Sequence, residues 1–367
     1  MTPEGIVSQF ASQVCPHDAI GNEIFAMRDL LAGFGLESAT FCDYADPALA
    51  GAVNRWSKRA AEDGRLTIVH FSHGSPSHER VFATAEPKML VYHNITPAHY
   101  FLSTHPRIAA ASRKGREQLA SLPESVDVAV AHSSFSAAEL RDLGFRRVEV
   151  LPYIPFESLY AVDPDPDLLR RYGGDGAVNL ICVAQIAPHK CIEDCILVFD
   201  YFRRVVHRNS RLFVIGGWSG TEAYLARLHR LVKMLGVEDV IFTGQVPQAA
   251  LVAYYRIADA LLCMSEHEGF CVPLIEAMRY DVPIFAYEAG AIPETLGSSG
   301  VSFRHKDWPL IAEAIGALLS TPRLKEQVLE KQRVQFSNYS MAACRKKFST
   351  LLASMGIAST QGQQKRQ

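Results

Sequence analysis

Short apolar runs that alternate with longer segments of mixed character constrain the fold of this chain more than any other feature. Each run is rich in Val, Ile, Leu and Phe, and the longest has seven residues. Continuous apolar character without alternation predicts strands that are buried on both faces, as in a parallel sheet. The runs are residues 67–72, 89–94, 128–133, 148–153, 179–184, 211–217, 240–244, 260–265 and 283–288.

The segments between these runs carry the pattern of amphipathic helices. In residues 192–202, and again in residues 221–235, apolar side chains recur at helical spacing with charged residues between them. Two successive series of alternating strands and helices predict two doubly wound α/β domains. Ligands bind such sheets beyond the carboxyl ends of the strands, so the residues that follow each strand are the first candidates for a site.

The length of 367 residues agrees with two domains, because it exceeds what one ordinary hydrophobic core supports. The change from one domain to the next is expected in residues 151–167, which hold four prolines and no clear helical stripe. We interpret this segment as a hinge between the domains.

Charge and hydropathy limit the possible locations and partners. The formal net charge is −2, whereas a protein that coats nucleic acid would show a strong basic excess. The first residues lack the basic and apolar regions of a signal peptide, and no apolar run approaches the roughly 18 residues of a membrane span. We therefore expect a soluble, cytoplasmic protein that does not bind nucleic acid.

The eight cysteines are scattered along the chain, and several lie inside apolar runs, so we expect buried free thiols. Cys191 and Cys195 are one helical turn apart, but no second pair with zinc-type spacing follows them. We assign both to the inner face of a helix and predict no metal site.

The segment EHEGFCVPLIEAM, residues 266–278, combines two acids with the signals of a turn and a helix start. Pro273 suits the first turn of a helix, and Gly269 permits a positive φ or a close backbone approach. Unpaired N–H groups near residues 269–272 would form the positive end of a helix dipole. The segment therefore predicts a site for an anionic or hydroxyl-rich ligand.

Glu268 is expected in the loop beside that ligand, and Glu276 in the first turn of the helix. Two carboxylates in these places are good acceptors for pairs of vicinal hydroxyls. The alternative is that both are ordinary acids that complement a helix dipole, and spacing alone leaves this alternative open.

The segment LICVAQIAPHKCIEDC places Gln185 and Lys190 in the loop between a strand and a helix. Lys190 could neutralise a diphosphate, or it could be a solvated loop residue. The chain contains neither GxxxxGK[ST] nor GxGxxG, so the common phosphate-binding fingerprints are absent.

Two weaker candidates lie in the first half of the chain. His93 ends a predicted strand, where it can orient a substrate or offset charge, although a lone histidine can equally be structural. Gly21 and Asn22 are expected in a turn before an amphipathic helix, with N–H groups exposed at the helix start.

Taken in chain order, these segments resemble the retaining glycosyltransferases of family 4, which have the GT-B fold. The most specific match is the E-x7-E motif at Glu268 and Glu276, followed by AGAIPETL. VAQIAPHK resembles the diphosphate loop of that family and FTGQVP its base-binding loop, while VYHNITP and HSSFSAAELRDLGF resemble its acceptor domain. The resemblance covers nearly the whole chain and is looser at its amino-terminal end.

The resemblance implies α/β architecture with two Rossmann-like domains that face a central cleft. Residues 1–155 would bind the acceptor, and the final helices, about residues 340–367, would complete this domain. Residues 156–339 would bind a nucleotide-sugar donor. The donor-binding set would be Gln185, Lys190, Val246, Glu268, Gly269, Phe270, Cys271 and Glu276.

Each implied role follows from the same resemblance. Glu268 would contact the hydroxyls of the transferred sugar, Glu276 the ribose, and Lys190 the diphosphate. Val246 would meet the base through its backbone. His93 would lie near the transferred sugar and the attacking acceptor, and the loop with Gly21 and Asn22 near the phosphates and the acceptor. The implied catalytic residues are His93, Glu268 and Lys190.

Gln185 departs from the pattern, because families of this type usually have arginine at that position. Glutamine can donate a hydrogen bond but carries no charge, so stabilisation of the leaving group should be weaker. This keeps open a non-catalytic protein that binds a sugar nucleotide and scaffolds a partner. A GT-B epimerase or phosphorylase is a further alternative.

The implied reaction moves a hexose from a nucleotide diphosphate to an acceptor with retention of configuration, without a metal or another cofactor. The donor would be a GDP- or UDP-hexose, and the acceptor a saccharide or a lipid-linked saccharide. Residues 99–122 carry basic and apolar residues that could contact an anionic membrane at the inner face of the plasma membrane, or could form a solvated helix face. The base, the sugar, the linkage and the oligomeric state are not determined by the sequence.

Overall fold

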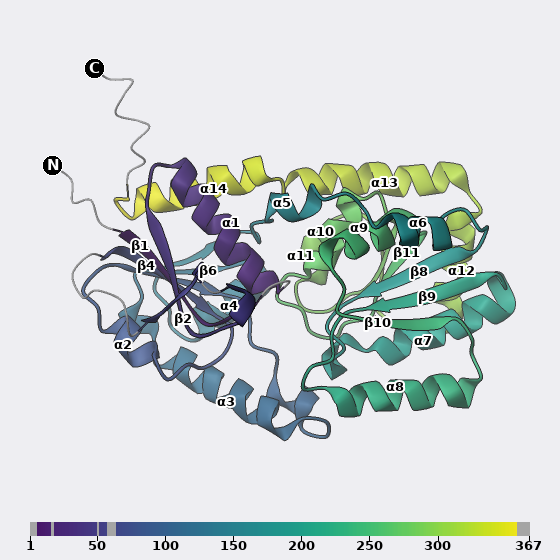
Figure 1. The fold of residues 1–367 in the computed structure, drawn as a ribbon, viewed down its shortest axis with the longest axis horizontal. Coiled ribbons are helices and arrows are strands. Elements are labelled where there is room, and N and C mark those ends of the chain that lie inside the picture. The colour runs from purple at the N-terminus through teal and green to yellow at the C-terminus, as the bar shows by residue number, and fades with distance from the viewer. Residues whose placement is uncertain (1–5, 16–17, 50, 57–63, 358–367) are drawn as a thin grey trace, which may run out of the picture. The chain divides into compact units, whose positions relative to one another are not determined.

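The computed structural model describes residues 6–15, 18–49, 51–56 and 64–357, which form two compact units (Figure 1). The last ten residues of the segment 340–367, expected to complete the first domain, lie outside this description. Unit 1 draws on Met1–Pro97, Ala110–Glu157 and Tyr339–Gln367, and unit 2 on Ala98–Ala109 and Ser158–Asn338.

Unit 1 is built on a parallel sheet with the strand order β3-β2-β1-β4-β5-β6-β7. Every strand pair in it is parallel, as the continuous apolar runs predicted. The strands are β1 Ile6–Val14, β2 Ser38–Ala45, β3 Asn54–Arg55, β4 Gly64–Phe71, β5 Lys88–Tyr92, β6 Val128–Ala131 and β7 Val148–Val150.

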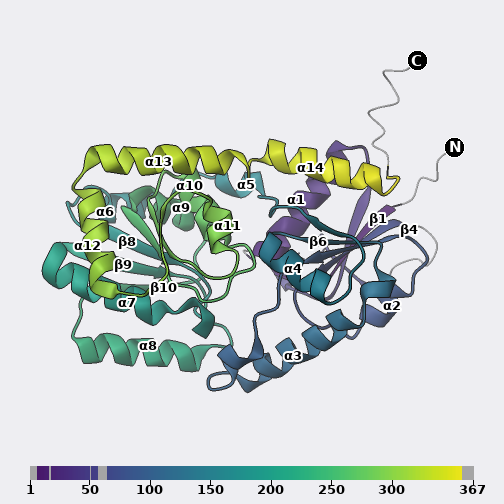
Figure 2. The same ribbon diagram turned by 180° about the vertical axis from the view of Figure 1, so that it is seen from behind.

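Helices cover both faces of this sheet (Figures 1 and 2). The helices are α1 Ala19–Gly33, α2 His78–Phe82, α3 Pro106–Ala120, α4 Ser134–Asp142 and α14 Met341–Ser354, with short 3-10 turns at Pro47–Leu49 and Pro123–Ser125. The first residues of α3, up to Ala109, are counted with unit 2. Side chains of α1 and α14 form one core with alternate strand residues, and side chains of α2, α3 and α4 form the other. Phe348 of α14 is fully buried in the first of these cores.

Unit 2 is built on a second parallel sheet with the strand order β10-β9-β8-β11-β12-β13. Its strands are β8 Val178–Val183, β9 Ser210–Ile215, β10 Val240–Gly244, β11 Ala260–Cys263, β12 Ile284–Tyr287 and β13 Val301–Phe303. Successive residues of a strand enter opposite cores, as Leu180 and Ile181 do, because side chains alternate across a strand.

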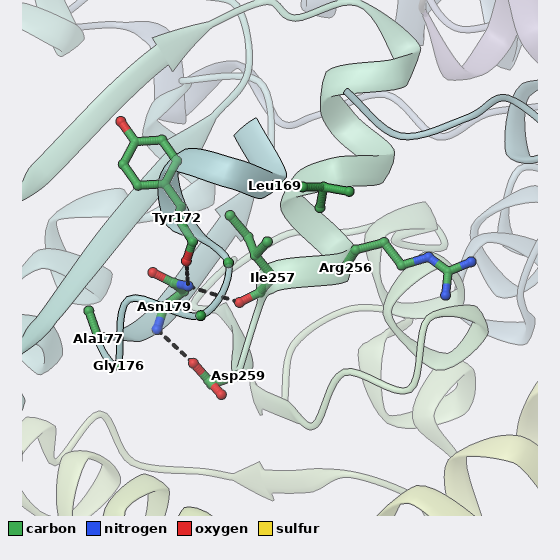
Figure 3. A pocket seen from close by; sticks show the side chains of 10 residues that line it. Leu169, Tyr172, Gly176, Ala177, Asn179, Arg256, Ile257 and Asp259 are labelled. Carbon is green, nitrogen blue, oxygen red and sulfur yellow. Dashed lines mark hydrogen bonds between the residues drawn. The ribbon is translucent and has the colours of Figure 1, made fainter. Parts of the chain in front are cut away.

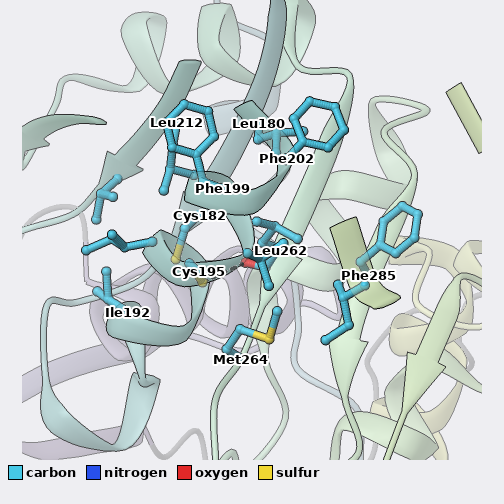
Figure 4. Packing of buried hydrophobic residues seen from close by; sticks show 14 of the residues in the cluster. Leu180, Cys182, Ile192, Cys195, Phe199, Phe202, Leu212, Leu262, Met264 and Phe285 are labelled. Carbon is cyan, nitrogen blue, oxygen red and sulfur yellow. Dashed lines mark hydrogen bonds between the residues drawn. The ribbon is translucent and has the colours of Figure 1, made fainter. Parts of the chain in front are cut away.

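The helices of unit 2 also lie on both faces of the sheet. Those that share the core with Leu180 are α7, α8 and α12, and Figure 4 shows Phe199, Phe202 and Leu262 at the centre of this packing. The helices are α5 Glu157–Tyr160 at the junction of the units, α6 Pro166–Tyr172, α7 Ile192–Tyr201, α8 Glu222–Leu235, α9 Gln248–Ile257, α10 Val272–Arg279, α11 Ile292–Leu296, α12 Trp308–Leu319 and α13 Pro322–Ser337, with 3-10 turns at Ala98–Phe101 and Pro188–Lys190 and a π-helical segment at Phe202–Val206.

The sequence did not predict β1, β2, β3 and β13. Strand β1 was not predicted because Ser8, Gln9 and Ser12 interrupt its apolar character, although all three are buried. The two helices expected in residues 192–202 and 221–235 are confirmed as α7 and α8.

The expected state of the cysteines is confirmed, because all eight are free and all but Cys15 are buried. Cys195 lies on the inner face of α7, as predicted, whereas Cys191 is the residue that precedes this helix. Among the helices that the structure describes, none has the length and apolar character needed to cross a bilayer.

Candidate functional site

In unit 2, the two sequence segments with the strongest motifs meet at the point where the strand order reverses. That point lies between β8 and β11, and such reversals are where open α/β sheets bind ligands. Lys190 follows β8 in the Pro188–Lys190 turn, and Glu268 follows β11. The Nζ of Lys190 donates a hydrogen bond to Oε1 of Glu268 at 2.7 Å, although the residues are 78 positions apart.

This ion pair is largely withdrawn from water, with side-chain exposures of 17% for Lys190 and 10% for Glu268. Burial disfavours the ammonium, but the charge of the Glu268 carboxylate and its hydrogen bond outweigh that effect, so the pKa of Lys190 is raised. Lys190 is therefore a fixed cation at neutral pH. The alternative of a solvated loop lysine is wrong.

The segment AGAIPETL packs against the loop that carries Glu268 and donates hydrogen bonds to its backbone. The N–H of Ala291 donates to the carbonyl of Glu268 at 2.9 Å, and the hydroxyl of Thr295 donates to the carbonyl of Phe270 at 2.6 Å. Gly290 has a φ of +57°, and a Cβ there would lie 2.5 Å from the Glu268 carbonyl oxygen. Only glycine therefore allows the two backbones to approach this closely.

The turn into α10 differs from the prediction in one respect. The left-handed conformation falls on Cys271, with a φ of +74°, and not on Gly269. The reason is that the helix begins at Val272, so the chain must change direction at the residue immediately before it. Pro273 lies in the first turn of α10, as predicted.

Glu276 is not in the first turn of α10, which contains no acid; it lies in the second. Its carboxylate is buried and accepts hydrogen bonds from the hydroxyls of Tyr255 at 2.8 Å and Tyr160 at 3.1 Å. Burial raises the pKa of Glu276, and the two tyrosine hydrogen bonds oppose this rise. Sequence reasoning did not find the tyrosines, because Tyr160 comes from α5 and Tyr255 from α9.

The other two donor-set residues lie in loops at the same edge of the sheet. Gln185 is exposed in the loop after β8, and Gly216 packs so closely against this loop that a Cβ would lie 1.9 Å from the Ala184 carbonyl oxygen. Val246 is partly buried against the core of unit 2, just after β10.

In unit 1, His93 follows β5 in a turn that other groups hold firmly. The N–H of His93 donates to the carbonyl of Phe71 at 3.0 Å, and Asn94 has a φ of +66°. The hydroxyl of Tyr92 accepts from the N–H of Ile95 at 3.0 Å. These contacts fix the direction of the chain immediately after His93.

His93 belongs to a buried group with Glu23, His70 and His132 that sequence reasoning missed. Ring nitrogens of His93 lie 3.1 Å from His70 and 3.4 Å from His132. Oε2 of Glu23, on α1, lies 3.1 Å from Nε2 of His132. The signal was present, because the runs 67–72, 89–94 and 128–133 each contain one histidine near the end, and their strands β4, β5 and β6 are neighbours.

Burial disfavours protonation of all three histidines. It lowers the pKa of His93 well below the usual value, with further lowering by His132 and His70. It also lowers the pKa of His70 to about 3. For His132, burial acts in the same direction, but the Glu23 carboxylate outweighs it and the pKa is raised.

Gly21 and Asn22 are not in a turn before the helix, as predicted, but inside α1. The helix begins earlier because the side chain of Asp18 caps it by accepting from the N–H of Ile20 at 3.3 Å. The N–H of Asn22 donates to the Asp18 carbonyl at 2.9 Å, so it is not exposed for a ligand. Gly21 instead allows a close approach, because a Cβ there would lie 2.5 Å from the carbonyl oxygen of Cys15.

The basic segment 99–122 is only partly available to a surface. Arg107, Arg113 and Lys114 are exposed. Arg116 instead pairs with the carboxylate of Glu139 and donates to a backbone carbonyl. It is therefore a structural residue of unit 1.

Two groups of side chains in the described part of the chain have the composition of metal ligands. They are Glu23 with His70 and His93, and Cys263 with Glu268 and Cys271, and within each group the ligand atoms lie within 4.8 Å of one another. Sequence reasoning considered only cysteine spacing, so the expected absence of a metal stays a prediction.

A pocket of about 480 Å³ lies at the opposite, amino-terminal edge of the unit 2 sheet. Figure 3 shows that its polar groups are engaged with one another: the side chain of Asn179 donates to the carbonyls of Tyr172 and Ile257, and its N–H donates to Asp259 at 2.8 Å. This network fastens the start of β8, and the candidate residues lie at the other edge.

Comparison with known proteins identifies the family that part of the chain matches and several relatives. Residues 175–339 match the family described as Glycosyl transferases group 1. Over 223 residues the chain is 27% identical to a GDP-mannose-dependent alpha-(1-6)-phosphatidylinositol monomannoside mannosyltransferase of Mycobacterium tuberculosis, which covers 56% of this chain and 55% of the relative. Over 181 residues it is 34% identical to D-inositol 3-phosphate glycosyltransferase 2 of Catenulispora acidiphila, which covers 44% of this chain and 42% of the relative.

The chain thus spans about half the length of these curated relatives. Solved structures match over almost the whole fold. HepE of Anabaena, in complex with UDP and glucose, has a TM-score of 0.74 at 15% identity and covers 95% of this chain and 100% of its own. Sucrose-phosphate synthase from Thermosynechococcus elongatus has a TM-score of 0.71 at 16% identity and covers 95% and 99%.

The family match covers the segments that hold both Lys190 and Glu268. Residues 175–339 therefore belong to the glycosyl transferases group 1 family, which is the retaining glycosyltransferase family 4, and the chain has the GT-B fold.

Proposed function

We propose that the protein is a retaining hexosyltransferase that uses a nucleotide-diphosphate sugar. It transfers the hexose to a saccharide or lipid-linked saccharide acceptor in polysaccharide or glycolipid biosynthesis. The observation that carries the proposal is the buried ion pair of Lys190 and Glu268 at the strand-order reversal, beside the start of α10. A cation, a carboxylate and a helix start in one place suit a ligand that has both phosphates and sugar hydroxyls.

In this proposal, unit 2 binds the donor and unit 1 the acceptor. Lys190 holds the diphosphate, and Glu268 accepts hydrogen bonds from the hydroxyls of the transferred sugar. The backbone of Gly269, Phe270 and Cys271 contacts the sugar and the phosphates. The buried carboxylate of Glu276 accepts from the ribose hydroxyls.

The remaining roles are assigned in the same way. Gln185 donates a hydrogen bond to the diphosphate, and Val246 meets the base through its backbone. His93 lies near the transferred sugar and the acceptor. The N–H of Asn22 is bonded to the Asp18 carbonyl and the N–H of Gly21 to the Asp18 carboxylate, so we assign these two residues no direct contact with a phosphate.

The chemistry needs charge stabilisation more than a protein nucleophile. The bond between the anomeric carbon and the diphosphate oxygen breaks, and negative charge grows on the departing phosphate beside Lys190. The acceptor hydroxyl bonds to the same face of the sugar, and its proton passes to the departing phosphate. Lys190 and the start of α10 supply the positive charge at the donor, so we propose that no metal ion is required there.

The relatives support two donor bases. The mycobacterial relative is named as dependent on GDP-mannose, whereas HepE was crystallised with UDP and glucose. We propose a GDP- or UDP-hexose. The first experiment is a thermal-shift screen against UDP, GDP, ADP and their hexose conjugates, in which a ligand at 100 times its Kd adds about 2.7 kcal/mol to stability.

A shift with one nucleotide that Glu276→Ala removes would identify the base and support the donor site. Slow hydrolysis of the matching sugar nucleotide would then separate an enzyme from a pure binder. The absence of a shift with all of these ligands would overturn the donor proposal.

The acceptor proposal rests on the exposed cations of the basic segment. In this proposal the protein is cytoplasmic and binds the plasma membrane peripherally. Arg107, Arg113 and Lys114 contact its anionic lipids, and each contributes about 1 kcal/mol to the free energy of membrane binding. Flotation with liposomes that contain anionic lipid tests this, with Arg113→Glu/Lys114→Glu as the variant. Flotation that is absent, or unchanged in the variant, counts against a lipid-linked acceptor.

One observation favours a second candidate function. Gln185 is exposed and uncharged where such families usually have arginine, which fits a sugar-nucleotide-binding scaffold that does not catalyse transfer. Gln185→Arg separates the two, because it should raise the rate of donor hydrolysis in an enzyme and leave a scaffold inactive. An epimerase or phosphorylase would be recognised by its products.

A further inference from the structure

The buried carboxylate of Glu276 lies between two tyrosines of unit 2. Its Oε1 accepts from the hydroxyl of Tyr160, at the end of α5, at 3.1 Å. Its Oε2 accepts from the hydroxyl of Tyr255, on α9, at 2.8 Å. Since Glu276 itself belongs to α10, three helices that are separate in the sequence meet at one carboxylate.

Both tyrosines act as hydrogen-bond donors. Burial and the charge of Glu276 raise the pKa of Tyr255 well above its usual value, so its hydroxyl keeps its proton. The carbonyl of Pro273 lies 3.5 Å from this hydroxyl, beyond the ordinary range, so the proton is directed to Glu276. An ionised carboxylate only accepts, so the hydroxyl of Tyr160 must donate as well.

The carboxylate has room for two more hydrogen bonds. Its two oxygens offer about four lone-pair positions in the ionised form. Among the described residues, Tyr160 and Tyr255 are the donors to these oxygens, and each bonds to a different one. One acceptor position therefore remains on Oε1 and one on Oε2, which matches the two hydroxyls of a vicinal diol.

Further side chains hold the two tyrosine rings in place. The guanidinium of Arg279 lies over the ring of Tyr160, 4.9 Å from its centroid. The ring of Tyr255 stacks on Tyr280, with centroids 5.4 Å apart and an interplanar angle of 16°. The guanidinium of Arg256 lies over Tyr280 at 5.4 Å. Each tyrosine is thus supported on the side away from the carboxylate, and its hydroxyl has a fixed direction.

The two hydroxyls also favour the charged form of the carboxylate. Burial raises the pKa of Glu276, and the hydrogen bonds of Tyr255 and Tyr160 oppose this rise. The loss of either hydroxyl would therefore make ionisation less favourable. The other titratable or charged side chains around this group are Cys271, Tyr280, Arg256 and Arg279.

We propose that Tyr255 and Tyr160 determine the specificity of the donor site for ribonucleotides, because they direct the two remaining acceptor positions of Glu276 toward a vicinal diol. This inference rests on the proposed function, which assigns Glu276 to the ribose. Both tyrosines are positioning residues, since they act through the carboxylate and not on the ligand. A nucleotide without the 2′- and 3′-hydroxyls should bind more weakly.

The first measurement uses the ligand-free protein and therefore needs no donor. Tyr255→Phe removes the hydroxyl, keeps the stacked ring and should raise the pKa of Glu276 further. Because this pKa is already raised by folding, stability is lost as the pH rises through the folded-state value. In the variant the loss should continue to a pH about one unit higher. Its deficit against wild type should therefore grow between acid and neutral pH, as measured by urea unfolding.

The control for this measurement is the same substitution in a Glu276→Gln background, where the deficit should not change with pH. Tyr160→Phe provides a second variant on another helix and should show the same growth of the deficit. Deficits of Tyr255→Phe and Tyr160→Phe that are independent of pH in the wild-type background would overturn the proposal.

The second measurement compares UDP and GDP with their 2′,3′-dideoxy analogues by calorimetric titration. Tyr255→Phe should reduce the preference for the ribonucleotide by about tenfold at neutral pH and leave the affinity for the analogue unchanged. Tyr254→Phe is the matched control. Tyr254 is also on α9 and buried, but its ring packs on Phe213 at 5.0 Å, so this variant should keep the full preference.

The outcomes separate this inference from the proposed donor site. A preference that is lost in Glu276→Ala but kept in Tyr255→Phe and Tyr160→Phe would support the donor site and overturn the role of the tyrosines. Equal losses of affinity for the ribonucleotide and the analogue would show a merely structural role and also overturn it. Wild-type protein that binds neither UDP nor GDP would overturn the donor site and the specificity together.

Discussion

The two units carry candidate sites at the same place in the same architecture, but they compensate buried charge differently. In unit 2 the carboxylate of Glu268 is paired with Lys190, a cation whose charge does not change near neutral pH. In unit 1, the ion-pair partners of the Glu23 carboxylate among the described residues are the imidazoles of His132 and His93. A lysine completes its site within the chain, whereas imidazoles acquire positive charge only by taking up a proton or a metal ion.

The largest effect is expected when the fixed cation is removed. Lys190→Ala leaves Glu268 buried without its partner, so we expect the free energy of unfolding to fall by about 3 kcal/mol. Donor hydrolysis or transfer should fall by about 100-fold or more, because the charge beside the leaving phosphate is lost. Urea unfolding and initial rates measure the two effects.

The double variant Lys190→Ala/Glu268→Ala is the control for this experiment. It should recover much of the stability without recovering activity, because no unpaired buried charge remains. A Lys190→Ala variant that is as stable and as active as wild type would show that Glu268 does not depend on a fixed cation. The two units would then not differ in how they compensate a buried carboxylate.

A second prediction asks how rigidly the loop of unit 2 is held. Gly290→Ala should cost about 1 kcal/mol for the positive φ and about 1 to 3 kcal/mol more for the collision with the Glu268 backbone. Gly236 is the matched control, because its φ is +62° but, its chain neighbours aside, no heavy atom of the described residues lies within 4 Å of a Cβ there. Equal losses of unfolding free energy in Gly290→Ala and Gly236→Ala would show that the close approach is unimportant.

A third prediction concerns Glu276, whose buried carboxylate accepts hydrogen bonds from two tyrosines. Burial raises the pKa of Glu276 above 4.5, and only the ionised form accepts from both ribose hydroxyls. Affinity for the nucleotide should therefore fall as the pH is lowered through this raised pKa, by up to about tenfold per pH unit, or about 1.4 kcal/mol.

Calorimetric titrations between neutral and acid pH measure this dependence. A 2′,3′-dideoxynucleotide is the control for ionisation of the phosphates, and its affinity should follow the pH less steeply than that of the ribonucleotide. Parallel curves for the two ligands would contradict the assignment of Glu276 to the ribose.

The smallest effect is expected in unit 1. Glu23→Gln should lower the free energy of unfolding by about 1 kcal/mol or less, because the lost charge was costly to bury and glutamine keeps an oxygen for the N–H of Ile154. Urea unfolding measures the change. A loss as large as that of Lys190→Ala would mean that His132 compensates Glu23 as strongly as Lys190 compensates Glu268.

The sequence predicted most of the fold, because both sheets are parallel and their central strands are continuous apolar runs. It also placed Lys190 and Glu268 after strands, and parallel strands bring such loops to one edge. It could not place Gly21 and Asn22 correctly, because the first residue of α1 depends on the capping contact of Asp18. Glu276 was placed one turn too early, although α10 begins beside Pro273 as predicted. The left-handed turn at Cys271 had no signal, since the sequence offered a glycine two positions earlier.

The histidine group was missed for a different reason. His70, His93 and His132 are far apart in the sequence, and each alone can be a structural residue. Their relation appears only when β4, β5 and β6 are known to be neighbours. Glu23 was hidden within a helical pattern, where an acid is usually on the solvent side.

The division of the chain between the units has a consequence for synthesis. Most of unit 2 is the continuous segment 158–338, whereas unit 1 takes Cys344, Phe348 and Leu352 of α14 into the core that holds Met27. Chains emerge from the ribosome amino-terminus first, and domains generally fold as units. The half of the molecule that is made first therefore completes its core last, and until then its apolar face is a natural substrate for chaperones.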